Sequence, residues 1–287
     1  MKTNRMIVTN GIRLNLVECG KPEGPSMIFL HGFPDFHHGW RYQAAYFDEQ
    51  KCHVLMPDQR GYNLSEKPKS VDDYSLDKLS RDIKGIIDSL GRTVWLIGHN
   101  WGGMVAWQIA LKFPELLNGL VILNAPHPEV YWDYYKSKKI PFGKNAQNMF
   151  FQVPGIAEGL LKMGNWSHFS QQFQKNARKG TITEGDLEKY RQAWNQSGAF
   201  SAMLNWQRAF HQQKSYLKTS LKIEVPVLFI HGQQDTALSP QMVKESLSRC
   251  NQHYLKQLPN AGHWVQLDQH AVVNQLIHEF ISHRSLL

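Results

Sequence analysis

The chain has 287 residues, of which 42% are hydrophobic, and this is enough to bury the core of one large domain. No apolar run approaches the ~20 residues that a membrane-spanning helix needs, and no apolar signal-peptide core is present, so we expect a cytoplasmic protein. The whole formal net charge of +8 lies in residues 127–222, where 14 basic residues accompany 6 acidic ones. This excess is either a solubilising surface or a site for an anionic ligand, partner or membrane surface.

The first 126 residues alternate between apolar, strand-like runs and helical patterns. Helices are expected at 42–50, at 75–91 and after residue 103, and the apolar spacing of three to four residues is clearest in 75–91. Such alternation predicts a largely parallel sheet with helices on both faces. Strands are expected at 13–18, 26–32, 52–58, 93–98 and 119–126.

From residue 127 to 222 this alternation stops, and the chain becomes aromatic, basic and mostly helical in pattern. The buried-strand pattern returns at 225–232, and a helix, a strand at 253–258 and a terminal helix follow. The simplest interpretation is one α/β core that is interrupted by a helical insertion. We therefore divide the chain into a first core part (1–126), a helical cap (127–222) and a second core part (223–287).

The segment GHNWGG (98–103) joins an expected strand to an expected helix through a glycine-rich turn. A strand, a sharp turn and a helix in this order present a catalytic nucleophile in many hydrolases. Here the residue at the tip is Asn100, and its neutral amide is a poor nucleophile. Asparagine nevertheless tolerates the positive φ of such a turn, so we expect the local fold to be retained.

Three further loops follow expected strands and carry polar residues: HGFPD (31–35), HGQQD (231–235) and PNAGHW (259–264). Ligand sites of such sheets lie beyond the carboxyl ends of the strands. A nucleophile position followed by a carboxylate and then a histidine is the order of the α/β-hydrolases. We expect His263 to act as general base, Asp235 to orient its imidazole, and the N–H groups of Phe33 and Trp101 to form the oxyanion hole.

Several motifs, in their order along nearly the whole chain, make it resemble the epoxide hydrolase branch of the α/β-hydrolases. This resemblance implies a mostly parallel eight-stranded sheet flanked by helices, with a helical cap insertion. It also implies an aspartate in a GHDWGG elbow that attacks an epoxide, a histidine that activates water to hydrolyse the resulting ester, and two cap tyrosines that donate protons. The motifs are HGFPD, PDQRGYNLSEKP (57–68), GHNWGG, NAPHP (124–128), FFQVPG (150–155), AMLNWQRA (202–209) and AGHW (261–264).

The sequence departs from that family at the reacting groups. Asn100 stands at the nucleophile position, Gln207 at one tyrosine position and Gln147 at the other. The resemblance places these two glutamines at the substrate, together with Asp35 and Trp101. Ordinary epoxide opening is therefore expected to be lost or weak, because an amide carries no attacking charge and its N–H is a far weaker acid than a phenol.

Four interpretations follow from this pattern. Because Asp235 and His263 are retained, water activated by His263 could hydrolyse esters, lactones or activated amides directly, with Asn100 donating a hydrogen bond. Deamidation of Asn100 could restore an ordinary epoxide hydrolase, or the chain could be an inactivated variant of one. A non-catalytic ligand-binding pseudoenzyme is a third possibility. A haloalkane dehalogenase is the weakest, since it too starts from an aspartate.

No metal or organic cofactor is expected, because the sequence contains no ligand-spaced cluster and no phosphate-binding glycine loop. The three cysteines are far apart and odd in number, which argues against a disulfide framework or a zinc site. We expect a small, apolar substrate or ligand, no nucleic-acid partner, no transmembrane segment, and a monomer or homodimer.

Overall fold

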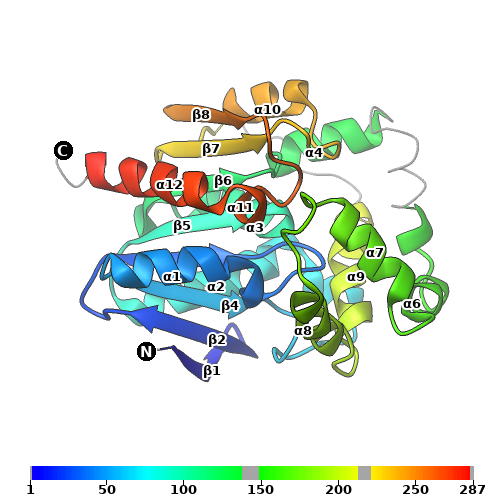
Figure 1. The fold of residues 1–287 in the computed structure, drawn as a ribbon. Coiled ribbons are helices and arrows are strands. Elements are labelled where there is room, and N and C mark those ends of the chain that lie inside the picture. The colour runs from blue at the N-terminus through cyan, green and yellow to red at the C-terminus, as the bar shows by residue number, and fades with distance from the viewer. Residues whose placement is uncertain (1, 138–148, 213–220, 285–287) are drawn as a thin grey trace.

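The computed structural model in Figure 1 describes residues 2–137, 149–212 and 221–284. Its centre is an eight-stranded sheet with the strand order β1-β2-β4-β3-β5-β6-β7-β8. Strand β2 pairs antiparallel with β1 and β4, and the remaining pairings are parallel. The strands are β1 (Thr3–Thr9), β2 (Ile12–Gly20), β3 (Ser26–Leu30), β4 (His53–Asp58), β5 (Val94–His99), β6 (Leu117–Leu123), β7 (Val227–Gly232) and β8 (His253–Leu258).

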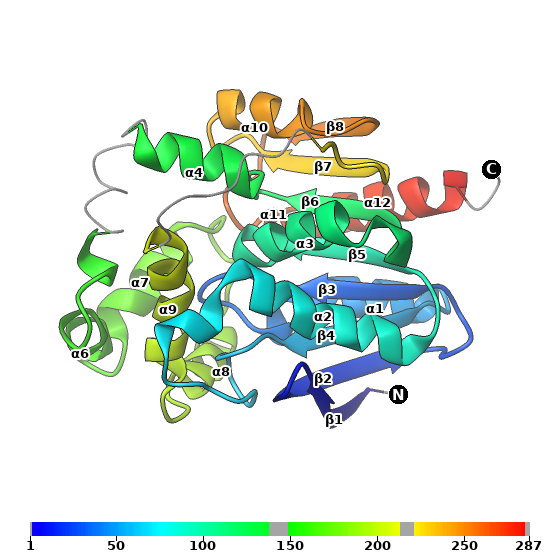
Figure 2. The same ribbon diagram turned by 180° about the vertical axis from the view of Figure 1, so that it is seen from behind.

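Helices cover both faces of this sheet and extend beyond one of its ends (Figures 1 and 2). One face carries α1 (Arg41–Glu49), α11 (Val265–Asp268) and α12 (His270–Arg284), and the other carries α2 (Leu76–Leu90) and α3 (Asn100–Lys112). Helix α10 (Pro240–Leu247) follows β7 and packs against α4 (Pro128–Lys136). The helices between β6 and β7 are α4 (Pro128–Lys136), α6 (Ile156–Lys162), α7 (Ser167–Lys175), α8 (Glu184–Trp194) and α9 (Ala199–His211).

Short 3₁₀ turns lie at His37–Trp40, Val71–Tyr74 and Pro114–Leu116. No helix in the described part of the chain is both long and apolar enough to cross a membrane.

The predicted α/β-hydrolase architecture is confirmed, and each of the seven expected strands is present. Strands β3, β4, β5 and β7 are buried along their whole length, as their continuous apolar runs predict. The sequence analysis missed β1, which lies at the sheet edge and buries only Ile7 and Thr9. An edge strand with one covered face needs no apolar run, so its sequence gives a weak signal.

Helix α2 shows how local sequence determines a helix of the layer that packs on the sheet. The Ser75 side chain accepts a hydrogen bond from the Lys78 N–H at 3.4 Å and so caps the helix N-terminus. Gly91 ends the helix in a left-handed conformation with φ +62°. Between these ends, the apolar face that the spacing predicts is buried in the core: Leu76, Leu79, Ile83, Ile86 and Ile87.

Glycines at the start of α3 allow this helix to approach the sheet closely. A Cβ atom on Gly102 would lie 2.3 Å from the carbonyl oxygen of Leu30, at the end of β3. A Cβ atom on Gly98 would lie 2.6 Å from the carbonyl oxygen of Gly102. Side chains at these positions would push α3 away from the ends of β3 and β5. The sharp turn at residue 100 therefore requires glycine at positions 98 and 102.

The helices that follow β6 are attached to the core loops by buried polar contacts. The Trp194 indole N–H donates to the carbonyl oxygen of Pro34 at 2.7 Å, and the Trp206 indole N–H donates to that of Arg60 at 2.9 Å. The Asp186 carboxylate accepts from His38 at 2.7 Å. Although burial acts in the opposite direction, hydrogen bonds from His38 and Thr183 lower the pKa of Asp186 to about 2. These contacts hold α8 over the loop that contains Phe33 and α9 over the loop that follows β4.

Candidate active site

Asn100 lies at the tip of the turn between β5 and α3 and has φ +51°. Its amide oxygen accepts a hydrogen bond from the backbone N–H of Phe33 at 3.1 Å. A backbone N–H can only donate, so the partner atom must be the oxygen, and this fixes which way the amide is turned. The Nδ2 group, which can only donate, therefore lies on the other side of the carboxamide, and it has no hydrogen-bond partner among the described residues.

His263 and Asp235 form a hydrogen-bonded pair. His263 Nδ1 lies 2.9 Å from Asp235 Oδ2, and the other carboxylate oxygen accepts from the Ala237 N–H at 2.6 Å. An ionised carboxylate only accepts, so Nδ1 carries the imidazole proton and Nε2 is left with a lone pair. This is the tautomer that a general base requires. The structure thus brings together the two residues that the sequence places at successive strand ends.

The loop that carries His263 is held by groups that the sequence analysis did not assign to the site. The Asn124 side chain donates to the carbonyl oxygens of Gly262 and His263, at 2.9 Å each, and accepts from the Gly232 N–H at 2.9 Å. His99 Nε2 donates to the same His263 carbonyl at 2.8 Å. Burial lowers the pKa of His99 to about 3, which keeps this histidine neutral. The signal that could have identified Asn124 is its place in NAPHP, directly after β6.

Asn100, Asp235 and His263 line one cavity of about 980 Å³. Gln207 on α9 lines it as well and is only 5% exposed. The remaining wall is largely aromatic and aliphatic, and it includes Phe33, Pro34, Trp101, Met104, Tyr131, Tyr134, Phe150, Phe151, Leu161, Phe169, Phe173, Leu238, Met242 and Trp264.

The two expected oxyanion donors differ in what surrounds them. The Phe33 N–H is occupied by the Asn100 oxygen. Trp101 is the second residue of α3, so its N–H belongs to the first helical turn, where backbone donors have no acceptor within the helix. The Trp101 ring lies against the ring of Phe210, with 5.7 Å between ring centroids, and forms part of the cavity wall.

The sequence analysis also expected Gln147 and Asp35 to contact the substrate. Gln147 lies outside the described residues. Asp35 is not among the residues that line the cavity; it is buried beneath the turn, 1% exposed. One carboxylate oxygen of Asp35 accepts from the Phe36 N–H at 2.7 Å and from the Tyr190 hydroxyl at 2.9 Å. Burial raises the pKa of Asp35 to about 7. This position makes Asp35 a support of the turn rather than a group that touches a ligand.

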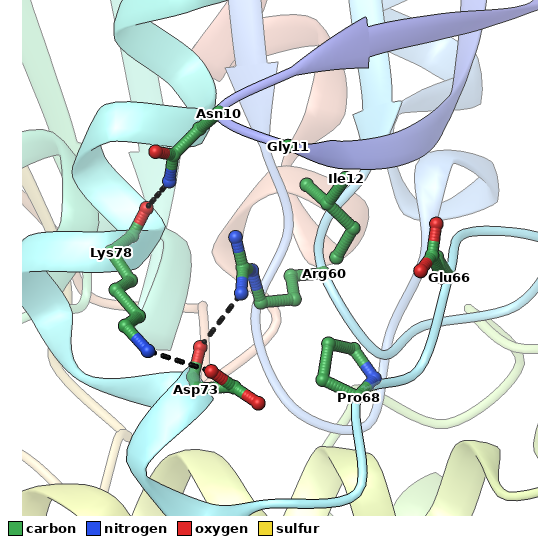
Figure 3. Close-up of a pocket in the computed structure, with 8 residues that line it drawn as sticks. All are labelled: Asn10, Gly11, Ile12, Arg60, Glu66, Pro68, Asp73 and Lys78. Atoms are coloured by element: carbon green, nitrogen blue, oxygen red, sulfur yellow. Dashed lines mark hydrogen bonds and ion pairs between the residues drawn. The ribbon is translucent and has the colours of Figure 1, made fainter.

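A second, smaller cavity of about 290 Å³ lies beside the β1–β2 turn (Figure 3). Its charged groups neutralise one another: Arg60 binds both oxygens of Asp82 at 2.7 Å, and Lys78 binds Asp73 at 2.6 Å. Arg60 also donates to the backbone carbonyl of Asp73 at 3.1 Å. We therefore infer that these paired charges stabilise the fold. The described residues contain no group of three or more side chains arranged to hold a metal ion.

A family model described as alpha/beta hydrolase fold matches residues 25–269. The AB hydrolase superfamily protein YfhM of Bacillus subtilis is 36% identical over 281 residues, which are 98% of this chain and 98% of that protein. Epoxide hydrolase 1 of Caenorhabditis elegans is 34% identical over 286 residues, 97% of this chain and 70% of that protein. An epoxide hydrolase from Bacillus megaterium, solved in complex with an inhibitor, has a TM-score of 0.87 at 29% identity, and the match covers 97% of this chain and 100% of that one.

Proposed function

The chain belongs to the α/β-hydrolase family, as an epoxide hydrolase-like member, and we propose that it hydrolyses esters or lactones with water activated by His263. The observation that carries this proposal is the orientation of the Asn100 amide. With its oxygen bound by the Phe33 N–H, the side chain offers an N–H donor where the family has an attacking carboxylate. Such a donor can stabilise a negative oxygen but cannot attack carbon.

The reaction follows from the atoms present. His263 Nε2 takes a proton from water while the water oxygen bonds to the substrate carbonyl carbon. The resulting oxyanion accepts from Asn100 Nδ2, and Asp235 stabilises the protonated imidazole across the 2.9 Å contact. When the carbonyl re-forms, the C–O bond to the leaving group breaks and the leaving oxygen takes the proton from His263. One ester and one water give one carboxylic acid and one alcohol, with no covalent enzyme intermediate.

The same residues argue against ordinary epoxide opening. That reaction needs an anionic nucleophile to form an ester and an acid to protonate the ring oxygen. Asn100 supplies no charge, and Gln207 presents an amide to the cavity where the family has a phenol. Loss of both groups removes the first half-reaction, while the His263–Asp235 pair that serves the second half-reaction is intact.

The test is hydrolysis of a panel of aryl esters and lactones by the unaltered chain and by His263→Ala and Asn100→Ala variants. We expect His263→Ala to lower kcat by roughly 10²- to 10⁴-fold and Asn100→Ala by roughly 10²- to 10³-fold. His270→Ala, a histidine stacked on Tyr42, serves as the matched control and should leave the rate unchanged. Hydrolysis that survives His263→Ala would overturn the proposal, and saturable ligand binding without any turnover would favour the pseudoenzyme interpretation.

The Phe33 contact also favours a second function, because it polarises the Asn100 carbonyl as an oxyanion donor would. Water activated by His263 could add to Cγ of Asn100 and expel ammonia, which leaves a carboxylate at position 100 and restores the family nucleophile. Intact-protein mass spectrometry with peptide mapping tests this directly, and Asn100 found fully unmodified after prolonged incubation rules it out. A triple variant, Asn100→Asp, Gln147→Tyr and Gln207→Tyr, tests the assignment of these three positions, and we expect it to open epoxides.

A further inference from the structure

Basic side chains of the cap line part of the large cavity. Lys175 ends α7, and Arg178 lies in the loop that follows; both line the cavity and both are exposed. His168 and Gln172, on the same helix, line it too. Asp235 is the only acidic residue in the described lining, and it is bound to His263.

Lys175 and Arg178 differ from Arg60, whose guanidinium is paired with the Asp82 carboxylate. Within the described part of the chain, neither side chain takes part in a salt bridge. Asp268 interacts electrostatically with the Arg178 guanidinium without a salt bridge, and it accepts from the Arg178 N–H at 2.7 Å, from the Gly262 N–H at 2.9 Å and from the Thr181 side chain. Because neither side chain donates a hydrogen bond to another described residue, the N–H groups of Lys175 and Arg178 are available to a ligand.

Asp268 also links the loop of Arg178 to the loop of His263. It bridges the backbone of Arg178, in the cap, to the backbone of Gly262, directly before His263. The loop that holds Arg178 and the loop that holds the general base are thus attached to one carboxylate. This attachment ties the backbone at Arg178 to the backbone next to His263, on the wall of the same cavity.

We propose that the cavity binds an apolar molecule that ends in an anionic group, with the anion at Lys175 and Arg178 and the apolar part against the phenylalanine wall. Arginine and lysine together recognise a carboxylate through charge-assisted hydrogen bonds. The phenylalanine wall, meaning Phe33, Phe151 and Phe169, offers no partner for a second charge. As to the reaction, this inference rests on the proposed function, and the substrate is then an ester or lactone that carries such an anion. Binding of the anion itself requires no turnover.

The experiment compares phenylbutyrate with phenylbutyramide, which match in shape and differ in charge, by isothermal titration calorimetry. We expect the unaltered chain to bind the acid roughly tenfold more tightly than the amide at low salt, and high salt to reduce this ratio. A Lys175→Gln/Arg178→Gln variant should bring the ratio close to one. The control, Lys21→Gln/Lys256→Gln, removes the same charge from exposed sites outside the cavity lining and should keep the ratio.

Equal binding of acid and amide by the unaltered chain would overturn the inference, and so would a preference that persists in the Lys175→Gln/Arg178→Gln variant. Failure to bind either compound would overturn it as well. Because calorimetry measures binding alone, these outcomes are independent of whether His263 performs hydrolysis. Conversely, if the chain binds the acid selectively but hydrolyses no ester, this inference holds and the proposed function is refuted.

Discussion

Asp35 gives a quantitative prediction about the stability of the turn that carries Phe33. Its carboxyl group is 1% exposed and has a pKa raised to about 7 by burial. In the unfolded chain, an aspartate has a pKa of about 3.9, so the folded state binds the proton more tightly. A raised folded pKa contributes stability that is fully present below the unfolded pKa and is lost as the pH rises through the folded pKa.

The Asp35→Asn substitution removes this titration and keeps the size of the side chain. Each pKa unit corresponds to about 1.4 kcal/mol, so a difference of about 3 units costs the unaltered chain about 4 kcal/mol once the carboxyl is ionised. About 3 kcal/mol of that cost is expected between about pH 5 and about pH 8. The free energy of unfolding of Asp35→Asn, relative to the unaltered chain, should therefore rise by this amount across the same interval.

Urea unfolding at several pH values, followed by tryptophan fluorescence, measures this difference. Asp88→Asn is the control, because it makes the same substitution at an exposed aspartate, the partner of Lys84 on α2. Contributions from buried histidines are common to both chains and cancel in the comparison. If the difference between Asp35→Asn and the unaltered chain is constant with pH, Asp35 is not held in its neutral form and our reasoning about the turn is wrong.

Two other predictions follow from close contacts around the site. Gly102→Ala should destabilise the fold by about 1–3 kcal/mol, because its Cβ would lie 2.3 Å from the carbonyl oxygen of Leu30. Thermal unfolding measures this loss. The control is Gly185→Ala, whose Cβ would lie 3.8 Å from its nearest neighbouring atom and should cause no such loss. Asn124→Asp should destabilise by about 1–3 kcal/mol and lower kcat, because it turns a donor to two carbonyls into an acceptor. Unchanged turnover in Asn124→Asp would show that the loop of His263 needs no such anchor.

Local sequence patterns determined most of the core. Continuous apolar runs predicted the buried strands, and the three-to-four spacing predicted α2, because both patterns record which side of an element is buried. The order of polar residues at strand ends identified the His263–Asp235 pair, since parallel strands bring their carboxyl ends to one edge of the sheet. Strand β1 gave no such signal because its edge position leaves most of it exposed.

The tertiary structure alone decided how the site residues are used. The N–H group that orients the Asn100 amide comes from Phe33, 67 positions away, and the phenol that contacts Asp35 comes from Tyr190 on α8. The anchoring of His263 by Asn124 likewise joins residues more than a hundred positions apart. Sequence periodicity describes the burial of each element by itself, whereas hydrogen-bond direction and the pKa of a buried acid depend on which distant atoms the fold brings within contact distance.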